Sequence, residues 1–517
     1  MSTAKTYNSF MHWLGGQFVR TKLNSPLGYI LLLTLAGILA YVIASVGIKI
    51  GALILVFIIV LPSILLAVFD LNFGIKIALV TAILVGWLSK YAELPFGIAM
   101  DALLFVMFFG LLIKQSRVKD MSFAKSPISI LILIWVFLNL FEVLNPAAES
   151  RLAWIFTVRS MAGLILLYFI ACYAFNSLKA ILNILKFIII LAFISALYGL
   201  KQEFFGFSDA EMTWLYSDKK RLQLILQWGR LRIFSFFSDP TNYGIFMAYM
   251  STFCFILSTG PFKLWQRFML LLGGALMIMG MAYAGSRTPF VLVPFGLVIF
   301  LLLTLKKEYI LVIGAVSVLG GAVIMKGHSN AVLYRIQSAF IPSKADDTMN
   351  VRAESRKFIQ PYVYTHPLGF GLGSTGVWAA RFTPDSFMAD FAHDSGYLRV
   401  AVELGWIGLI IICLFLLVVM RTSIYYYLRV KNPKIKIIYL GITVIFFQLA
   451  LANFPQEALT ILPTSIIFYL LLAITVKLKD FDTVVIDAKE ADSGHISFTE
   501  PEDLSENNEE LAANQAK

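Results

Sequence analysis

The chain has 517 residues, of which 59% are apolar and 14% are charged, and its mean hydropathy is +0.80. A soluble protein of this length would carry about 25% charged residues, so the composition excludes an ordinary soluble protein. The apolar residues fall in blocks of roughly 18 to 23 residues, the length that a helix needs to cross a bilayer.

These blocks predict an all-α polytopic membrane protein, because only helices and closed barrels satisfy their backbone groups in lipid and the blocks lack the alternation of barrel strands. About fourteen spans are expected, with a large outer loop before a late span. They centre on residues 26–47, 51–69, 73–89, 96–114, 127–145, 154–175, 180–199, 241–259, 266–283, 288–305, 309–325, 404–420, 435–452 and 460–477.

The loops after the fourth, eighth, tenth and twelfth spans are rich in Lys and Arg, which assigns them to the cytoplasmic side. The basic residues are Lys114, Arg117, Lys119, Lys125, Lys263, Arg267, Lys306, Lys307, Arg421, Arg429, Lys431, Lys434 and Lys436. The alternation favours an even number of spans, so we expect both termini to be cytoplasmic.

This frame divides the chain into three parts. We expect a cytoplasmic N-terminal segment at 1–25 and a transmembrane domain at 26–477 with outer loops at 200–240 and 326–403. The acidic tail at 478–517 has few large apolar residues and is expected to be disordered and cytoplasmic.

The cysteines indicate neither a disulfide framework nor a zinc site, because Cys172, Cys254 and Cys413 lie inside apolar blocks and form no CxxC pair. Nor is there a dense acidic cluster of the kind that a divalent cation needs. We expect no metal and no cofactor.

The first candidate site is the segment 232–244, which joins the first outer loop to a span. Asp239 and Asn242 flank a Pro and are typical of a turn that opens a helix, so capping explains them as well as ligand binding does. Arg232 is not required by a cap. An Arg beside a helix N-terminus forms an anion site, although an interfacial Arg is the alternative.

The second candidate site is the turn at 284–289, between two spans on the predicted outer face. Small residues, including Ser286, let a ligand approach the backbone closely. Arg287 lies near the start of the next helix, where its charge adds to the positive helix end. That arrangement is unfavourable unless an anion binds, and an interfacial anchor is again the alternative.

The third candidate site is His393, at the end of the second outer loop. It is followed by Asp394 and Ser395, a capping pattern, and then by a helix rich in small residues. A neutral imidazole near pH 7 is a natural general base for a hydroxyl, although a capping or hydrogen-bonded structural histidine is also compatible.

Weaker candidates lie elsewhere. Arg352 and Arg356 are one helical turn apart and could present a basic face to phosphate, or pair with nearby carboxylates. The glycines at 369, 371 and 373 suggest a flexible turn, since no Lys-Ser/Thr follows them. Asp101 and Arg159 lie within spans, where a buried polar pairing is the simplest explanation and a proton relay through Asp101 would suit a transporter.

Together, four segments resemble the O-antigen ligase and O-antigen polymerase superfamily. They are RIFSFFSDPTNYG at 232–244, AGSRTPF at 284–290, HPLGFGLGS at 366–374 and AHDSGYLRVAVELGWIGL at 392–409. They occur in the order of that family, on a similar hydropathy frame, and the similarity covers roughly residues 150–475.

The resemblance implies a membrane-embedded glycosyltransferase that uses a polyprenyl-diphosphate-linked glycan donor. Arg232 and Arg287 would bind the diphosphate and His393 would be the essential catalytic histidine. Asp239, Asn242, Ser286, Arg352, Arg356 and Asp394 are possible supporting residues. We expect a metal-independent transfer, because the lipid diphosphate is already a good leaving group and arginine binds phosphate in bidentate fashion. We also expect inversion of the anomeric centre, because the acceptor would attack opposite the leaving group.

The resemblance also implies a bacterial inner-membrane location, with the active site facing the periplasm and membrane lipids around the spans. The acceptor hydroxyl could belong to a growing glycan, a lipid A core sugar or a protein, and the sequence does not decide among them. No nucleic-acid partner is expected. The alternative is a transporter or flippase of lipid-linked glycans, which would place its charges along a path through the bilayer rather than at one face.

Overall fold

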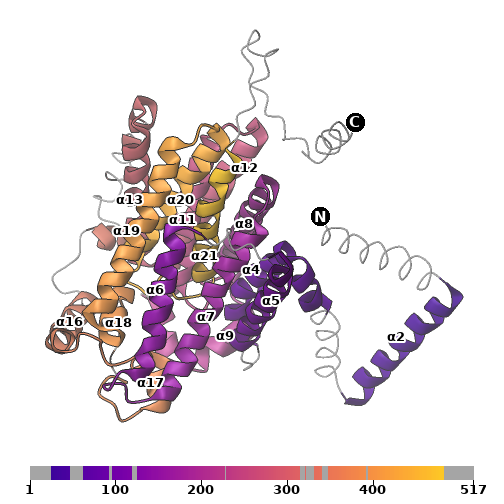
Figure 1. The fold of residues 1–517 in the computed structure, drawn as a ribbon, viewed down its shortest axis with the longest axis horizontal. Helices are drawn as coiled ribbons and strands as arrows, with labels where there is room; N and C mark the ends of the chain where they lie inside the picture. The colour runs from indigo at the N-terminus through magenta and orange to yellow at the C-terminus, as the bar shows by residue number, and fades with distance from the viewer. Residues whose placement is uncertain are drawn as a thin grey trace, which may run out of the picture.

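The structure is a computed structural model that describes residues 25–46, 62–91, 96–118, 125–227, 229–311, 313–314, 321, 331–340, 347–389, 391 and 394–482. The described chain is almost entirely helical (Figure 1). The long helices are α2 (Pro26–Val46), α4 (Leu71–Leu88), α5 (Phe96–Val118), α6 (Pro127–Phe141), α7 (Arg151–Ala174), α8 (Leu178–Phe205), α11 (Pro240–Ser258), α12 (Leu264–Ala284), α13 (Arg287–Thr304), α16 (Asp347–Thr365), α19 (Gly405–Arg429), α20 (Pro433–Ala452) and α21 (Thr464–Lys477).

Shorter elements connect these helices. They are η3 (Glu142–Leu144), α9 (Asp209–Tyr216), α10 (Lys219–Ile225), the antiparallel pair β1 (Leu226–Gln227) and β2 (Arg230–Leu231), α15 (Ala331–Phe340), α17 (Gly376–Phe382), α18 (Gly396–Glu403) and η4 (Leu478–Phe481). The predicted outer loop at 200–240 therefore has structure of its own, because a capping box at Ser208 starts α9 and Asp218 caps α10.

Within the described residues, nine helices are long and apolar enough to cross a membrane, namely α4 to α8, α12, α13, α19 and α20. Helices also cover the predicted spans at 26–47, 241–259 and 460–477. The predicted spans at 51–69 and 309–325 lie largely outside the described residues, so the count of fourteen stays a prediction. Several boundaries differ, because α5 continues to Val118, α12 begins at Leu264, α19 continues to Arg429 and α20 begins at Pro433. Basic residues that we had expected in loops therefore lie within helices, namely Lys114, Arg117, Arg267, Arg421, Arg429, Lys434 and Lys436.

Helix α11 lies at the centre of the bundle, and 17 of its 19 residues are buried. It packs against α8, α12, α13 and α20. Glycines make this close packing possible: Gly199 on α8 and Gly280 on α12 both lie against the ring of Tyr243, where a Cβ would collide with the phenol. A helix that is apolar all round is stable only inside such a bundle.

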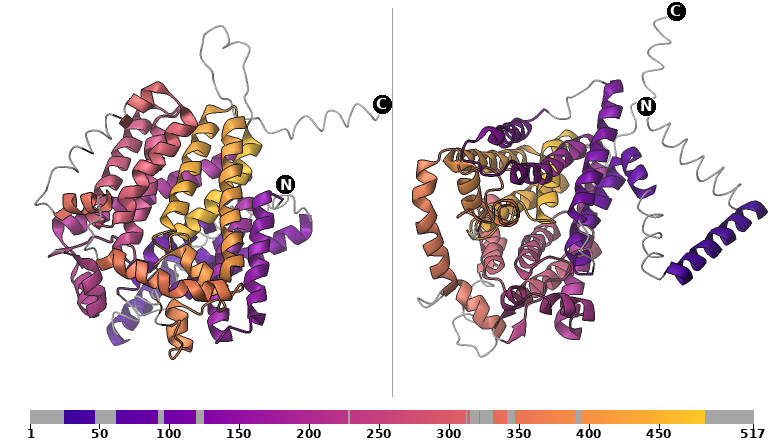
Figure 2. Two further views of the ribbon diagram at one scale, coloured as in Figure 1. Left: turned by 90° about the vertical axis from the view of Figure 1, so that its left-hand side faces the viewer. Right: turned by 90° about the horizontal axis from the view of Figure 1, so that it is seen from below.

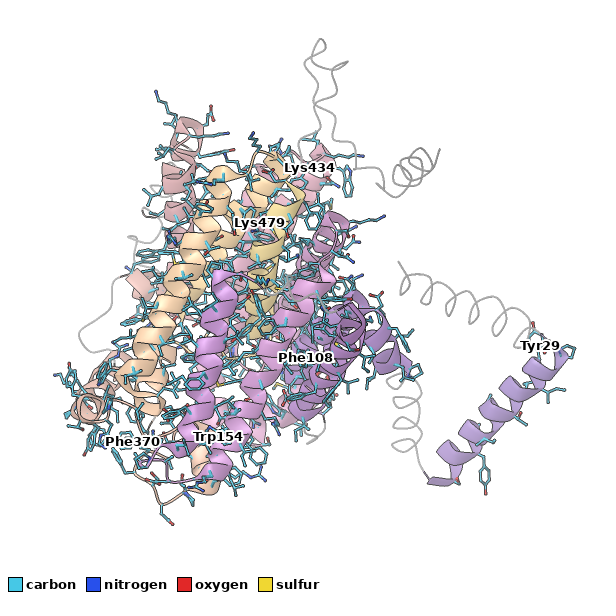
Figure 3. The ribbon with its side chains drawn as sticks, viewed as in Figure 1. Tyr29, Phe108, Trp154, Phe370, Lys434 and Lys479 are labelled. Carbon is cyan, nitrogen blue, oxygen red and sulfur yellow. The ribbon has the colours of Figure 1, made fainter. Side chains whose placement is uncertain are left out.

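The bundle has two distinct ends (Figure 3). Lys434 and Lys479 lie at one end, which we call the lysine end. Trp154 and Phe370 lie at the other, which we call the loop end. The helices α16, α17 and α18 gather at the loop end in the views of Figures 1 and 2. The basic connection between α19 and α20 therefore lies at the lysine end, and the longer loops lie at the other end of the bundle.

Candidate functional site

Arg232 is held at the loop end by three oxygen atoms. Its Nε donates to the carbonyl of Ala284 (2.8 Å), Nη1 to that of Leu224 (3.3 Å) and Nη2 to the Thr241 hydroxyl (3.4 Å). The side chain therefore ties the loop before α11 to the turn between α12 and α13. The motifs at 232–244 and 284–290, far apart in the sequence, meet at this contact.

A second arginine, Arg335 on α15, reaches the same turn. Its Nε donates to the carbonyl of Gly285 (2.9 Å), the residue next to the one that Arg232 contacts. Sequence analysis missed Arg335, and no local motif indicates it. The only signal is that Arg335 lies in an amphipathic helix, α15, whose residue Ile336 packs against the core and so fixes the position of the helix.

Burial is the largest of the effects that lower the pKa of Arg232 from 12.5 to about 10, and the nearby positive charge of Arg335 lowers it further, while Asp239 acts in the opposite direction. The guanidinium is still charged at neutral pH, although its surroundings disfavour the charge. A bound anion would remove this penalty.

Arg287 is the first residue of α13, directly after this turn, and is half-buried. Gly285 caps α12 with a left-handed backbone (φ 60°), and the buried Ser286 is the N-cap of α13. The structure thus brings Arg232, Arg287 and Arg335 to a single turn, which we call the arginine turn.

Asp239 has the capping geometry that the sequence predicts, and Asn242 contacts the cap. The Asp239 carboxylate accepts hydrogen bonds from the backbone N–H groups of Thr241 (2.8 Å) and Asn242 (3.0 Å) at the start of α11, and also from the Asn242 side chain. The capping interpretation is confirmed for Asp239, whereas Asn242 lies within α11 and holds the Asp239 carboxylate in place. Their supporting role at a ligand site stays a prediction.

Lys90, which sequence analysis did not single out, holds the loop that carries Arg232 in place through hydrogen bonds to its backbone. Its Nζ donates to the carbonyls of Phe237 (3.0 Å) and Ser235 (3.4 Å) and lies 3.9 Å from the centre of the Phe234 ring. Gln202 completes the support, because its Oε1 accepts from the backbone N–H groups of Phe234 and Ser235. Ser235 adopts a positive φ of 51° within this network.

His393 lies outside the described residues, but the segment that follows it is described. Asp394 is exposed, and Ser395 is the N-cap of α18. The backbone N–H of Gly396 donates to the Asn453 carbonyl (3.0 Å), and a Cβ on Gly396 would collide with the Asn453 side chain. Asn453 directly follows α20, so this segment is anchored to the end of that helix.

The end of α20 lies at the level of the arginine turn. Gln448 on α20 donates to the Leu292 carbonyl on α13 (2.9 Å), while Tyr427 at the end of α19, just before α20 begins, donates to the Leu303 carbonyl near the end of α13. The two helices are therefore antiparallel. At 1.5 Å per residue, the start of α13 and the end of α20 each lie roughly 6 to 8 Å beyond the Gln448 contact.

Arg356 on α16 also reaches this region, because its guanidinium lies 4.7 Å from the centre of the Phe454 ring. Arg352 is on the same helix, and its side chain lies outside the described residues. The structure therefore brings Arg356, but not demonstrably Arg352, to the end of α20.

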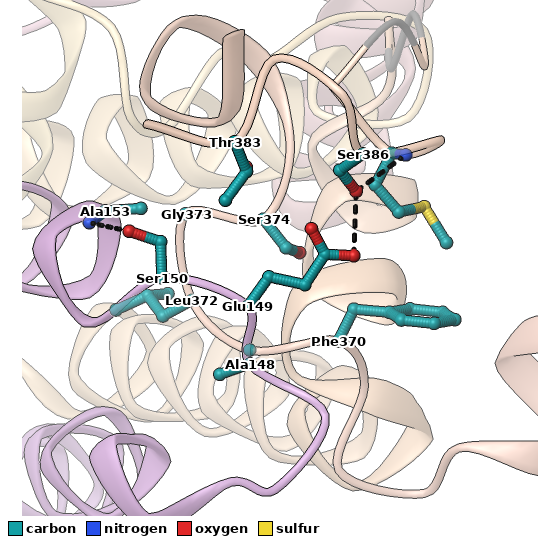
Figure 4. A pocket seen from close by; sticks show the side chains of 12 residues that line it. Ala148, Glu149, Ser150, Ala153, Phe370, Leu372, Gly373, Ser374, Thr383 and Ser386 are labelled. Carbon is teal, nitrogen blue, oxygen red and sulfur yellow. Dashed lines mark hydrogen bonds between the residues drawn. The ribbon is translucent and has the colours of Figure 1, made fainter. Parts of the chain in front are cut away.

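The glycine-rich segment at 366–374 forms a rigid docking turn rather than a flexible one. Gly369, Gly371 and Gly373 all have positive φ values, between 72° and 91°. The N–H groups of Phe370 and Gly371 donate to the carbonyls of Val402 and Glu403 at the end of α18. On its other side the turn lies against the start of α7, where Ser386 bonds to Glu149 (Figure 4).

Gly405 belongs to the same contact. Its positive φ of 65° and its approach to the Pro367 carbonyl show that it allows the 366–374 turn to dock. The close backbone approach, and not a phosphate, explains the glycines in this motif.

Two sets of partly buried charges form ion pairs within the described residues. Arg159 on α7 forms an ion pair with Asp101 on α5 (3.0 Å). At the loop end, Arg399 bridges Glu403 (3.1 Å) and Glu457 (2.8 Å), and the charge of Glu403 is the main cause that raises the pKa of Arg399. Within the described residues, no three His, Cys, Asp or Glu side chains are arranged to hold a metal ion.

The fold defines an all-α polytopic membrane protein whose loop end carries both a cluster of arginines and the segment that follows His393. Residues 272–413 match the family model described as O-Antigen ligase, and this match confirms the resemblance to the O-antigen ligase and polymerase superfamily. The matched region runs from α12 into α19 and includes the arginine turn, although Arg232 precedes it. A comparison with curated proteins finds no match.

Proposed function

We propose that this protein transfers or polymerises a glycan from an undecaprenyl-diphosphate-linked donor onto an acceptor hydroxyl at the periplasmic face of the bacterial inner membrane. The family match supports a glycan-transfer function of the O-antigen ligase or polymerase type in a membrane. The observation that carries the donor assignment is the convergence of Arg232 and Arg335 on the consecutive carbonyls of Ala284 and Gly285, two to three residues before Arg287.

In this proposal, Arg232 and Arg287 bind the donor diphosphate. The diphosphate is negatively charged, and further negative charge develops on its leaving oxygen as the glycosidic bond breaks. Cations held in fixed positions stabilise that charge. Arginine suits the task because it stays protonated and binds phosphate oxygens in pairs. The bound diphosphate also reduces the repulsion between the positive charges of Arg232 and Arg335, and this reduction favours its binding.

His393 accepts the proton of the acceptor hydroxyl as its oxygen attacks the anomeric carbon. Attack from the side opposite to the diphosphate inverts the anomeric centre, and the transfer needs no metal ion. The hydroxyl, the anomeric carbon and the diphosphate must lie in line, so most of the rate comes from positioning and electrostatics. Asn453 and Gln456 support this geometry by holding the backbone of Gly396.

The test compares glycan display on cells that carry Arg287→Ala, Arg232→Ala or His393→Ala. Loss of one transition-state contact costs about 100-fold or more in rate, so long glycan should disappear in each. Arg381→Ala is the matched control, because Arg381 is an exposed arginine on α17. Membrane abundance is measured in parallel.

The products identify the acceptor class. A short-repeat product in the variants indicates a polymerase, while intact polymer left on its lipid carrier indicates a ligase. If His393→Ala displays glycan as the wild type does at equal abundance, the catalytic assignment is wrong and a transporter of lipid-linked glycans becomes the better explanation.

A further inference from the structure

A second polar site lies at the loop end, in a cavity of about 250 Å³ between α6, α7, α18, α19 and α21. Its polar lining comes from the loop end and includes Arg399, Glu403, Asn453 and Glu457. Its apolar lining comes from inside the helices and includes Trp135, Phe415 and Phe468. We call it the Arg399 cavity.

The cavity adjoins the segment that follows His393, because Gly396 and Asn453 both line it and bond to each other. It lies on the other side of α20 from the arginine turn. Helix α20 packs on α11 and α13 on one side, and the residue that follows it, Asn453, faces the cavity. Seen from the loop end, the C-terminal helices lie between the purple helices near 127–174 and the pink helices near 264–304 (Figure 2, right).

The charges of the lining disfavour a phosphate. One guanidinium, Arg399, is bound by the two carboxylates of Glu403 and Glu457, and Glu403 also accepts from the Thr375 hydroxyl (2.7 Å). The carboxylates outnumber the cation, so a diphosphate would be repelled here and attracted at the arginine turn. A neutral ligand with many hydroxyl groups suits carboxylate, amide and hydroxyl partners.

The volume of the cavity and its aromatic side chains further restrict the class of ligand. Drug-sized ligands occupy cavities of about 300–1,000 Å³, so this cavity holds one or two rings rather than a long glycan. Trp378 lines it and stacks with Phe156 at 4.8 Å between ring centres, which fixes an apolar plane beside the polar groups. Ligand sites commonly combine such apolar walls with a few placed polar groups.

We propose that the Arg399 cavity binds a neutral sugar ring of the acceptor glycan. The inference rests on the proposed function, and it favours a glycan acceptor over a protein hydroxyl. Donor and acceptor then occupy opposite sides of the end of α20, the end to which the segment that follows His393 is anchored through Gly396 and Asn453. This arrangement suits an attack opposite to the diphosphate.

Photo-crosslinking in cells tests the inference directly. Ser160→p-benzoylphenylalanine places the probe in the lining of the cavity, and Ile155→p-benzoylphenylalanine is the control. Ile155 is 49% exposed and lies five residues earlier on α7, about 140° around the helix. We expect adducts that carry glycan at position 160 only, and these should persist when Arg287→Ala is added, because the acceptor does not use the arginine turn.

Three results would overturn the inference. Adducts with lipid but without sugar would assign the cavity to hydrocarbon. Adducts that disappear when Arg287→Ala is added would show that the Arg399 cavity binds the donor. Glycan adducts that are equally frequent at positions 160 and 155, or absent from both, would show that the cavity is not a sugar site.

A filling variant gives an independent result. Ser160→Trp should lower the glycan product at least about tenfold while the lipid-linked donor still copurifies, whereas Ile155→Trp should match the wild type. Full product from Ser160→Trp contradicts the acceptor site. Full product and donor binding in Arg287→Ala contradict the proposed function instead, so the two failures are distinguishable.

Discussion

Two cations, the half-buried Arg232 and the buried Lys90, have different electrostatic surroundings, although Arg232 lies in the loop before α11 and Lys90 donates to the carbonyls of that same loop. Arg232 keeps its charge at neutral pH, and its contacts are two carbonyls and a hydroxyl. Burial lowers the pKa of Lys90 from 10.5 to about 7, and Glu211 and Asp239 only partly oppose that effect. A neutral amine still has two hydrogens for the carbonyls of Ser235 and Phe237, so Lys90 can support the loop without a charge.

The depressed pKa of Lys90 predicts a pH dependence of stability. Between about pH 7 and 10.5 the unfolded state binds a proton at Lys90 that the folded state does not, so stability rises with pH in that window. The slope from this group is at most about 1.4 kcal/mol per pH unit. Thermal unfolding of the purified protein in detergent from pH 6.5 to 9.5 should show this rise for the wild type.

Lys90→Met is the control for that experiment, because it removes the titrating group and keeps most of the side-chain volume. Its unfolding profile should lack the rise. An identical pH profile in the variant and the wild type would show that Lys90 is charged in the folded protein throughout this range.

At the scale of elements, the 366–374 turn carries α17 and aligns the end of α18. A Cβ on Gly369 would lie 2.5 Å from the Gly405 nitrogen and 2.6 Å from the Val402 carbonyl oxygen. These are backbone atoms of a helix junction, which cannot move aside as the end of a flexible side chain can. The loop end therefore depends on a glycine at this position.

Gly369→Ala should destabilise the protein more strongly than Gly206→Ala. Both glycines have positive φ values, 72° and 84°, but nothing lies within 4 Å of a Cβ on Gly206. Backbone strain alone costs on the order of 1–3 kcal/mol, and Gly369→Ala adds a collision. Thermal unfolding measures the difference, and equal losses would mean that the turn is more pliable than its contacts indicate.

At the scale of the whole molecule, the two ends of the bundle differ in kind. The lysine end has short basic connections, and the loop end has the arginine turn, the Arg399 cavity and the segment after His393. Inside the bundle, Arg159 and Asp101 neutralise each other locally. This distribution favours chemistry at one face over passage through the bilayer.

The orientation of these ends can be tested by cysteine labelling in intact cells. In a Cys413→Ala background, Val377→Cys should react with a membrane-impermeant maleimide added outside, because Val377 is 78% exposed at the loop end. Lys434→Cys should react only after the cells are opened, since the lysine end is expected in the cytoplasm. The opposite pattern would invert the topology and remove the periplasmic site.

Much of this architecture follows from the sequence, because hydropathy and the positions of Lys and Arg act locally and along a single axis. Most predicted spans coincide with helices, and the cap at Asp239 has its predicted form. The motifs also indicate the family that the match at 272–413 supports. A span needs only its own composition to be recognised, and a cap needs only its neighbouring residues.

The tertiary structure alone decides which distant residues meet. Arg335 lies 50 residues beyond the carbonyl that it contacts, and the partners Arg399 and Glu457 are 58 residues apart. Their convergence depends on how helices pack, which local patterns do not encode. For the same reason, the glycines at 369–373 could suggest a flexible turn until the packed junction of α18 and α19 explained them. The sequence determined a helical membrane protein with basic residues near its loops, and only the packing of the helices decided that three of them share one turn.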